Sequence, residues 1–577
     1  MAKSTNSKQT LSVEYSGFGG IDTRNYHKGG IQDALNLRIL SDGSLQKRRG
    51  YRCIQKVAAN IRAIWSGVIG GVFSCYYLVG SNVYKLNLQE ESSSLVGILS
   101  PSTSKVQFFY YRDALYLTDN ERIYKIQSDG ISAVAGYVPL LGKNWGTGHP
   151  GEINEPLNLL HRRARITYKI EEGHSAYLPT LYPVQYIEAL YKNGVLLATT
   201  DYSFDSRFNT INISNLADGD ELVALLTFTR VNEEEKDALL SNTSAYVFGG
   251  INNSRLLMWG GEVENTIFIS THVSEASLAE SKKYFPNSDH FYFCADNHFT
   301  VGDGRYSVKA VTRHFDRLLI LTEGDTWMAD SSSCDQEKVP IMNVNSRVGC
   351  CSEDAVISIG NDPVSVGEKA IFRWTSDTDE LNDCNAYSIS DEISALLPAE
   401  FFSNAKVFAD RYRGEVWFAQ ANGDGTAWIY NTAKKAWTRF NNIRTSAFFD
   451  ANGEVGFIND DKICVFDDEY YSDCENTDGT DEMFITASLK SGIIDFASAK
   501  EKRLKYFSCL ANLNGSRLNA NITTDRGESV NIQLGSKGEH AAYSSRIHSH
   551  RHSFLSFTLS MPGSGRQTLQ SLKLEAK

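Results

Sequence analysis

The sequence has little or none of several features that mark other classes of protein. Only 11 of its 577 residues are proline, a scarcity that favours strands joined by tight turns. Its first ten residues, MAKSTNSKQT, have no apolar core, so we expect no secretory signal peptide. The ten cysteines form no Cys-x-x-Cys pair and no cysteine–histidine group with the spacing of zinc ligands. Scattered cysteines of this kind are typical of small buried side chains, and we expect reduced thiols in a cytosolic setting.

Catalytic motifs are missing too. The sequence contains no glycine-rich phosphate loop followed by Lys-Ser/Thr, no serine nucleophile elbow and no HExxH. Residues 423–428 (GDGTAW) and 323–327 (EGDTW) come nearest to a sialidase Asp box, but they depart from its spacing and have the composition of hairpin turns. We therefore predict that the protein is not an enzyme and takes neither a cofactor nor a metal ion. A glycosidase stays open as an alternative, because its paired carboxylates leave no sequence signature.

The longest run without charge, residues 63–80 (AIWSGVIGGVFSCYYLVG), has the length of a membrane-spanning helix. Four glycines interrupt it, however, and Gly70-Gly71 separates two runs rich in β-branched and aromatic residues. This pattern favours a buried hairpin over a spanning helix.

What the sequence does contain favours many strands joined by tight turns. It has 28 tyrosines, 29 phenylalanines and 44 glycines, which suit strands and turns respectively. Its 42% hydrophobic and 22% charged residues are typical of a folded protein. A chain of this length exceeds what one hydrophobic core organises, so we expect several domains.

Blocks of strand, turn and strand recur along the chain. A single small antiparallel sheet cannot bury its own faces, and radial stacking of such sheets solves this problem. We therefore predict an all-β fold built on a degenerate β-propeller. The seven blocks are residues 73–86, 106–126, 254–270, 308–328, 355–374, 407–430 and 445–466. Period-2 spacing predicts blade-core positions at Tyr76, Leu78, Tyr116, Leu117, Leu319, Ile320, Phe372 and Trp417.

Two regions interrupt these blocks. A Gly/Pro-rich linker leads into short strands around the Asn193-Gly194 hairpin turn, which predicts an inserted β-sandwich, and short alternating strands predict a second sandwich at the C-terminus. Helices are expected only at residues 232–240, from Asn232, and at 274–284. The predicted domains are 1–141 (N-terminal segment and first blades), 142–230 (insert), 231–466 (remaining blades), 467–482 (acidic linker) and 483–577 (C-terminal β-domain).

Two polar segments leave alternatives open. Residues 467–482 (DDEYYSDCENTDGTDE) hold eight carboxylates and no Lys or Arg; a solvated linker is favoured over a calcium-binding loop, because the EF-hand spacing is absent. His548, His550 and His552 alternate, which would place them on one face of a strand. An exposed strand face is favoured there over a transition-metal site.

The most informative stretch is residues 17–51, GFGGIDTRNYHKGGIQDALNLRILSDGSLQKRRGY. A Gly29-Gly30 turn precedes a strand, and Asp42-Gly43 is typical of a hairpin turn. The stretch resembles the N-terminal signature of the tail nozzle and packaged-DNA-stabilising proteins of tailed bacteriophages, a family of β-propeller tail tubular proteins. Residues 483–577, with IIDF, KEKR and DRG between their strands, resemble the C-terminal β-domain of the same proteins.

The resemblance implies a structural protein of the virion tail, assembled in the host bacterial cytoplasm. Its subunits would form a ring, a homohexamer, below the portal and adaptor proteins and in contact with tail fibre or tail tip proteins. The ring would continue the DNA channel, retain packaged double-stranded DNA and let it pass at ejection. A net charge of −12 suits a channel wall along which DNA slides without sticking. The alternative, from another class, is a receptor- or carbohydrate-binding propeller on the virion surface.

The signature also supplies the candidate contact residues. Lys47, Arg48 and Arg49 form a local basic cluster, which we predict to contact carboxylates of a neighbouring subunit or, less favoured, DNA phosphates. We further predict that a hairpin of residues 33–38 and 43–51 completes the propeller or locks it to a neighbour. The reason is that an open sheet edge invites aggregation.

Overall fold

The computed structural model describes residues 10–101, 104–128, 130–146, 151–171, 177–229, 233–249, 254–330, 339–375, 386–536 and 540–577. These residues form two compact units. Unit 1 comprises residues 1–95, 323–326 and 344–577, and unit 2 comprises residues 96–322 and 327–343. The fold is all-β, and within the described residues no helix is long and apolar enough to cross a membrane.

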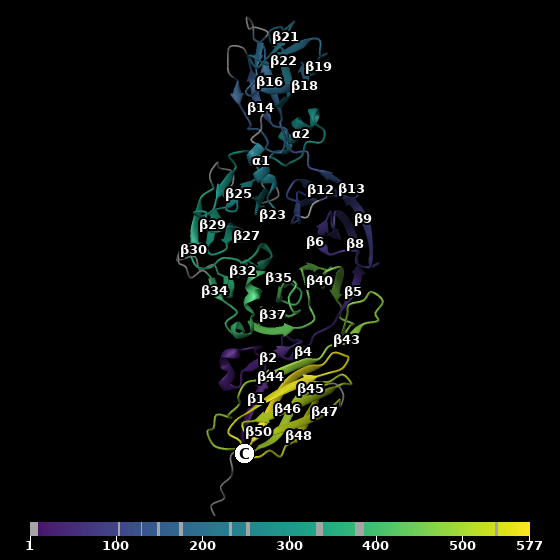
Figure 1. Ribbon diagram of the computed structural model, residues 1–577, viewed down its shortest axis with the longest axis vertical. Helices are drawn as coiled ribbons and strands as arrows, with labels where there is room; N and C mark the ends of the chain where they lie inside the picture. The colour runs from purple at the N-terminus through teal and green to yellow at the C-terminus, as the bar shows by residue number, and fades with distance from the viewer. Residues whose placement is uncertain are drawn as a thin grey trace, which may run out of the picture. The chain divides into compact units, whose positions relative to one another are not determined.

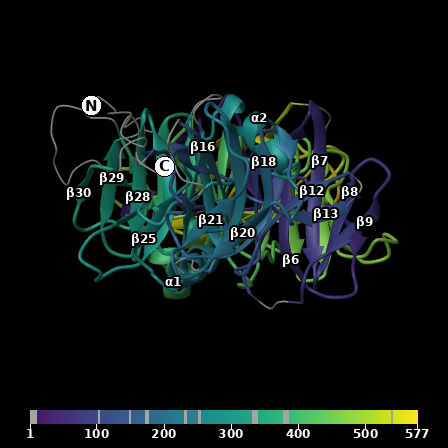
Figure 2. The same cartoon turned by 90° about the horizontal axis from the view of Figure 1, so that it is seen from above.

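Among the described residues, five sheets have four strands each, and two larger sheets each include a further run of four antiparallel strands. Four antiparallel strands are the form of a propeller blade, and four of these seven blades belong to unit 1. The first two are β31 (Val356–Ile359), β32 (Asp362–Val366), β33 (Ile371–Trp374), β34 (Ala386–Ser388), and β35 (Ala405–Asp410), β36 (Glu415–Gln420), β37 (Ala427–Asn431), β38 (Ala436–Phe440). The next are β39 (Ala447–Asp450), β40 (Val455–Asn459), β41 (Lys462–Phe466), β5 (Tyr51–Lys56), and β6 (Ile61–Ile69), β7 (Val72–Val79), β8 (Asn82–Asn87), β9 (Ser92–Ile98). Figure 2 shows β7, β8 and β9 side by side. The hairpin predicted for residues 63–80 is confirmed, with β6 and β7 joined by Gly70-Gly71.

The other three blades belong to unit 2. They are β10 (Gln107–Tyr111), β11 (Ala114–Thr118), β12 (Ile123–Gln127), β13 (Gly130–Ala133); β23 (Ser244–Phe248), β24 (Arg255–Trp259), β25 (Thr266–Ile269), β26 (His298–Thr300); and β27 (Val308–His314), β28 (Arg317–Thr322), β29 (Thr326–Asp330), β30 (Ile341–Asn345).

Unit 2 also contains the inserted domain. One of its sheets has the order β15 (Glu152–Ile153), β14 (Leu140–Trp145), β16 (Arg163–Lys169), β22 (Glu221–Phe228), β18 (Val184–Lys192), β19 (Val195–Leu196). The second consists of β17 (Tyr177–Pro179), β21 (Thr210–Ile213) and β20 (Tyr202–Asp205). Residues of both sheets share one apolar core, and the turn at Asn193-Gly194 joins β18 to β19 as predicted.

Both predicted helices are present. α1 spans Glu233–Leu240, while Asn232 lies outside the described residues. α2 spans Glu275–Tyr284, and the Ser274 hydroxyl caps it by accepting the backbone N–H of Ser277.

Polar side chains fix the base of the inserted domain. The Asn158 amide donates to the carbonyls of Tyr137 (2.9 Å) and Phe291 (2.8 Å) and accepts the N–H groups of Leu160 and Phe293. His161 Nε2 lies 2.9 Å from the Tyr137 carbonyl, and Nδ1 accepts the Arg163 N–H. Both ring nitrogens are therefore bonded when the imidazole is neutral, and burial lowers the pKa of His161 to about 4.

Blades of unit 1 share their cores with their neighbours. Trp417 packs edge-to-face on Phe440 and Phe466, with ring centroids 5.3 and 5.1 Å apart. Seven of the eight predicted blade-core residues are buried. The exception is Phe372, which is half-buried and lies close to Gly367. On the same strand, Trp374 is the fully buried aromatic residue.

The C-terminal domain of unit 1 is a sandwich that includes N-terminal strands. One sheet has the order β3 (Leu37–Ile39), β4 (Leu45–Lys47), β50 (Thr568–Ala576), β45 (Leu504–Asn512), β48 (Ala541–Arg546), and β1 (Leu11–Ser16) also pairs with β50. In the other, β2 (Ile31–Leu35) lies between β38 and β44 (Ala487–Ser491), followed by β49 (Leu555–Met561), β46 (Arg517–Thr524), β47 (Ser529–Gly535). Figure 1 shows the purple N-terminal strands beside these green and yellow ones.

The N-terminal segment does close the last blade, but with a different strand from the predicted one. β5 pairs with β41 in the register Phe466↔Tyr51 and Cys464↔Cys53, so it is the fourth strand of that blade. The predicted hairpin exists, as β3 and β4 around Asp42-Gly43, yet β4 pairs with β50 of the C-terminal domain. The predicted second strand, residues 43–51, is thus divided: β4 joins the C-terminal domain, and Tyr51 begins the closing strand, which extends to Lys56.

Candidate functional site

The basic cluster of the signature begins with the last residue of β4, Lys47, and continues into the turn that leads to β5, inside unit 1. Backbone bonds hold it on both sides: the Lys47 N–H donates to Gln567 O and the Arg48 N–H donates to Asn36 O. Gly50 ends the cluster because a Cβ there would lie 1.8 Å from the carbonyl oxygen of Ser472. Only glycine permits this approach, and it brings the cluster against the acidic segment.

Arg48 is the centre of the site, which we call the arginine joint. Its side chain is 1% exposed and forms a two-pronged pair with Asp473, with Nη1–Oδ1 at 2.7 Å and Nη2–Oδ2 at 2.5 Å. Nε donates to Asn36 Oδ1, and the two remaining N–H groups donate to the carbonyls of Arg49 and Asn441. All five donors of the guanidinium are thus used within the chain.

This placement corrects the prediction for Arg48. The carboxylate that it pairs with comes from the same chain, and a fully enclosed guanidinium has no surface to offer to a second subunit or to DNA. Lys47 and Arg49 are also buried but line a cleft. For these two, a contact with another molecule stays a prediction.

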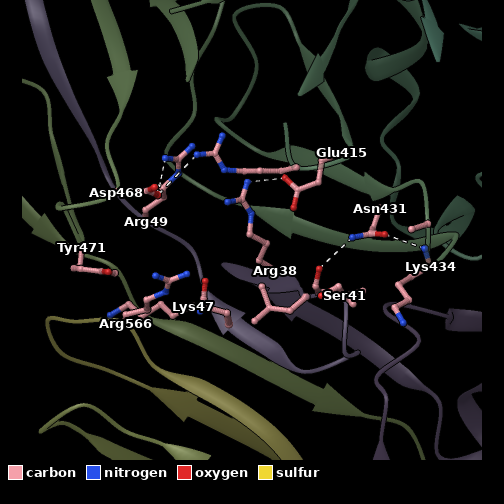
Figure 3. Close-up of a pocket in the computed structure, with 15 residues that line it drawn as sticks. Arg38, Ser41, Lys47, Arg49, Glu415, Asn431, Lys434, Asp468, Tyr471 and Arg566 are labelled. Carbon is pink, nitrogen blue, oxygen red and sulfur yellow. Dashed lines mark hydrogen bonds and ion pairs between the residues drawn. The ribbon is translucent and has the colours of Figure 1, made fainter. Parts of the chain in front are cut away.

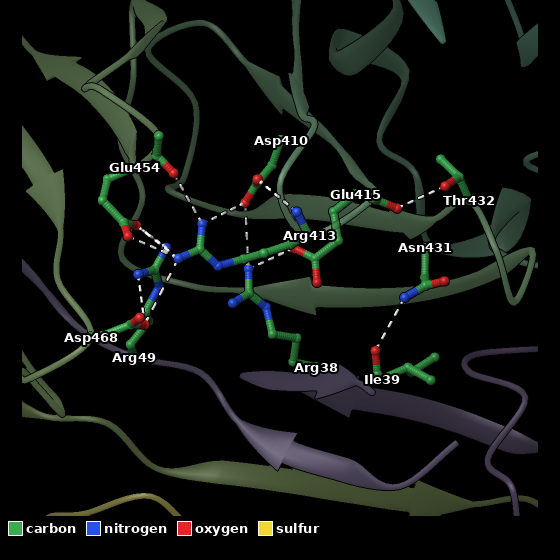
Figure 4. A network of polar contacts seen from close by, with 12 residues as sticks. Arg38, Ile39, Arg49, Asp410, Arg413, Glu415, Asn431, Thr432, Glu454 and Asp468 are labelled. Atoms are coloured by element: carbon green, nitrogen blue, oxygen red, sulfur yellow. Dashed lines mark hydrogen bonds and ion pairs between the residues drawn. The ribbon is translucent and has the colours of Figure 1, made fainter. Parts of the chain in front are cut away.

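Three more arginines, each paired with one or more carboxylates, extend the arginine joint (Figure 4). Arg413 pairs with Asp410 (3.2 Å) and Glu454 (2.9 Å). Arg49 pairs with Asp468 (2.7 Å) and also contacts Glu454. Arg38, on β3, pairs with Glu415 (2.7 Å) on β36. The network links the signature to two blades and to the acidic segment.

The prediction that residues 467–482 form a solvated linker is therefore wrong for residues 472–475, while Asp468 and Glu469 are exposed as expected. Asp473 is fully buried, and Glu475 pairs with Lys462 at 3.0 Å. Two short strands, β42 (Ser472–Cys474) and β43 (Glu482–Phe484), pair there, and β42 joins β5. The prediction of exposure assumed that no cation lay nearby. Arg48 and Arg49 of the signature, more than 400 residues away in sequence, supply the counter-charges of Asp473 and Asp468.

A cleft of about 430 Å³ opens beside the arginine joint (Figure 3). Besides Arg38, Arg49 and Arg413, it is lined by Lys47, Lys434 and Arg566. The Lys47 ammonium donates to the Gly563 carbonyl, and burial together with the nearby Arg48 charge lowers the pKa of Lys47 to about 8. Arg566 is exposed.

The chemistry of the cleft is that of charge recognition. Its lining offers cationic donors and two carboxylates, Glu415 and Asp468, which are both engaged with arginines. Within the described ranges no group of three or more His, Cys, Asp or Glu side chains has the arrangement of a metal site. The arrangement can bind an anion.

The alternating histidines do not share a face as expected. His552 is buried, His548 and His550 are exposed, and none of the three lies in a strand. Seven of the eight described cysteines are buried, as predicted, with Cys351 half-buried, while Cys334 and Cys384 lie outside the described residues.

No protein-family model matches the sequence, and no curated protein is significantly similar to it. Among solved structures, a chain of a mitotic checkpoint complex matches 73% of this chain over 92% of its own, at 10% identity and a TM-score of 0.34. The CNH domain AfRom2 matches 72% over 99% of its own chain, at 7% identity and a TM-score of 0.35. An exo-β-1,3-galactanase from Phanerochaete chrysosporium matches 82% over 96%, at 10% identity and a TM-score of 0.18. These likenesses are too weak to bear on function.

Proposed function

We propose that this chain is a structural protein of a bacteriophage tail. Its subunits form a homohexameric ring that continues the DNA channel below the portal and adaptor proteins, retains packaged DNA and lets it pass at ejection. The observation that carries the proposal is the place of the signature. Residues 17–51 contribute strands to the C-terminal sandwich, supply the arginine joint and lead directly into the strand that closes the last blade. Such a segment suits a ring subunit that must keep its shape while a duplex passes.

The inserted domain supplies a surface for assembly. Ile153, Val195, Leu196 and Phe208 are exposed there, Phe208 to 76%. Exposed apolar groups of this kind mark contact surfaces, and a closed ring needs two different contact patches on each subunit. We assign one of the two patches to this domain.

Electron microscopy of the purified protein tests the proposal, and a ring with a duplex-wide pore is expected. Replacing Val195, Leu196 and Phe208 by Ser should leave the circular dichroism unchanged but yield monomers in size-exclusion chromatography with light scattering. Phe484→Ser, which removes an equally exposed apolar group on β43, is the matched control and should still assemble. A monomeric wild-type protein, or a ring without a pore, would contradict the proposal.

A second candidate, carbohydrate binding at the virion surface, is favoured by one observation. A cleft of about 560 Å³ in unit 1 brings Tyr26 and Trp428 together with Asp33, Asp424 and Gln32. Tyr26 is 43% exposed, so its ring is available for a sugar to stack on. A glycan array compared between wild type and Tyr26→Ala tests this candidate. Glycan binding that Tyr26→Ala abolishes supports it, and an array without hits rules it out.

A further inference from the structure

The cleft beside the arginine joint carries an excess of positive charge. Six cationic side chains line it, whereas four carboxylates line it or pair with those cations. The whole chain has a net charge of −12, so this local excess runs against the overall balance. A partly enclosed cluster of like charges is costly to maintain unless something of opposite charge occupies it.

Two of these arginines keep unused donors. Arg38 Nε and Arg49 Nε are buried and have no hydrogen-bond partner within the described part of the chain. The contrast with Arg48 is sharp, because all five of its donors are satisfied. Buried polar groups are normally paired, so Arg38 and Arg49, which both line the cleft, keep hydrogen-bonding capacity that the described part of the chain does not fill.

The volume of the cleft and the positions of its cations indicate the size and the charge of the ligand. Figure 3 shows Arg49, Lys47, Arg566 and Tyr471 around one end of the cleft, with Lys434 and Asn431 at the other. A volume of about 430 Å³ suits a small molecule. Arginine presents a planar fork to oxyanions, and lysine adds a point charge.

We propose that this cleft binds a small ligand that carries at least one phosphate group, held by Lys47, Arg49 and Arg566. The ligand neutralises the excess positive charge of the cleft, and its phosphate oxygens accept hydrogen bonds from the three cations that hold it. It also bridges the signature, through Lys47 and Arg49, to the turn that precedes β50, through Arg566. Binding therefore strengthens the attachment of the signature to the C-terminal sandwich, and it requires no ring assembly.

The test uses the full chain with pyrophosphate as the probe, at constant ionic strength set with sodium chloride. Pyrophosphate should raise the melting temperature and give saturable heat in isothermal titration calorimetry. Arg566→Ala should weaken this binding about tenfold or more, since it removes a charge-assisted contact. Because Arg566 is exposed, its variant should melt as wild type does in chloride alone. Arg546→Ala, another exposed cation of the same domain, is the matched control and should bind as wild type does.

Three further arms decide the source and the specificity. Inorganic phosphate should bind more weakly than pyrophosphate, and sulfate should not reproduce the full effect. A short DNA duplex that displaces pyrophosphate in wild type but not in Arg566→Ala would identify backbone phosphates as the source. An absence of saturable binding, or equal binding by Arg566→Ala and wild type, overturns the proposal. Ring formation is measured separately, by particle size. A failure of the phosphate-binding proposal would therefore be distinguishable from a failure to form rings.

Discussion

The arginine joint of unit 1 and the base of the inserted domain in unit 2 solve a similar problem by different chemistry. Each holds a connecting segment against strands distant in sequence. The arginine joint does so with buried ion pairs, of which Arg48–Asp473 is the most enclosed. The base of the insert relies on Asn158 and His161 bonded to backbone groups. A buried charge is tolerated only when its partner of opposite charge is also present. The stability of neutral hydrogen bonds depends instead on their geometry and on whether a group such as His161 becomes protonated.

The largest effect is expected from breaking the Arg48–Asp473 pair. Asp473→Asn or Arg48→Met leaves one buried charge without its partner, which costs about 3–5 kcal/mol. Hydrogen exchange of the peptide that contains β5 measures the local opening free energy. The double variant Arg48→Met/Asp473→Leu should recover most of the loss. Single variants that lose less than about 1 kcal/mol would show that the pair behaves like a surface pair.

The neutral base of the insert should respond to Asn158→Ala by a smaller amount. The change removes the acceptor of the Leu160 and Phe293 N–H groups and one of the donors to each of the Tyr137 and Phe291 carbonyls, and we expect a loss of about 2–4 kcal/mol. The readout is hydrogen exchange of residues 137–145. Asn154→Ala, whose exposed amide donates only to Leu140 O, is the control and should cost well under half as much.

Acid should separate the two regions. His161 has a lower pKa in the folded state (about 4) than in the unfolded chain (6.5), so between these values the unfolded chain binds more protons and stability falls as the pH drops. From pH 7 to pH 5 we expect the base of the insert to lose about 1–2 kcal/mol. His161→Gln should flatten this slope, as measured by hydrogen exchange at both pH values. An unchanged slope would show that His161 is not responsible.

The smallest effect is expected at the surface of unit 1. Arg24 pairs with Glu392 at 2.6 Å, but its side chain is 52% exposed. Arg24→Ala should cost no more than about 1 kcal/mol, and the difference should vanish in high salt. Chemical denaturation of wild type and variant at low and high salt measures it. A salt-independent loss as large as that of Asp473→Asn would remove the distinction between enclosed and exposed pairs.

Local patterns in the sequence predicted the elements well. The turns at Gly70-Gly71, Asp42-Gly43 and Asn193-Gly194 were identifiable because each is set by neighbouring residues. The blade cores followed from period-2 spacing, with Phe372 as the exception. Such features depend on a few consecutive residues, which a sequence displays directly.

The arginine joint was only half predictable. The sequence pointed to Lys47, Arg48 and Arg49, but the partner of Arg48 lies 425 positions further on, and no local pattern encodes so distant a pairing. Arg38, Arg413 and Arg566 went unnoticed because none of them belongs to a run of consecutive cations. The one usable signal was complementarity, since a basic run followed by glycine and an acidic run without cations each lack a counterpart nearby.

The closing strand has a consequence for biosynthesis. β5 leaves the ribosome early, but its partner β41 ends about 400 residues later, which at cellular elongation rates is roughly 20–80 s. Throughout that interval the nascent chain carries a strand with no completed sheet to join. The same interval leaves Arg48 without Asp473, so the charge on that side chain helps to keep the waiting segment hydrated. Completion of the last blade therefore waits until β41 has been synthesised, and until then the unpaired strand is a segment that a chaperone would protect.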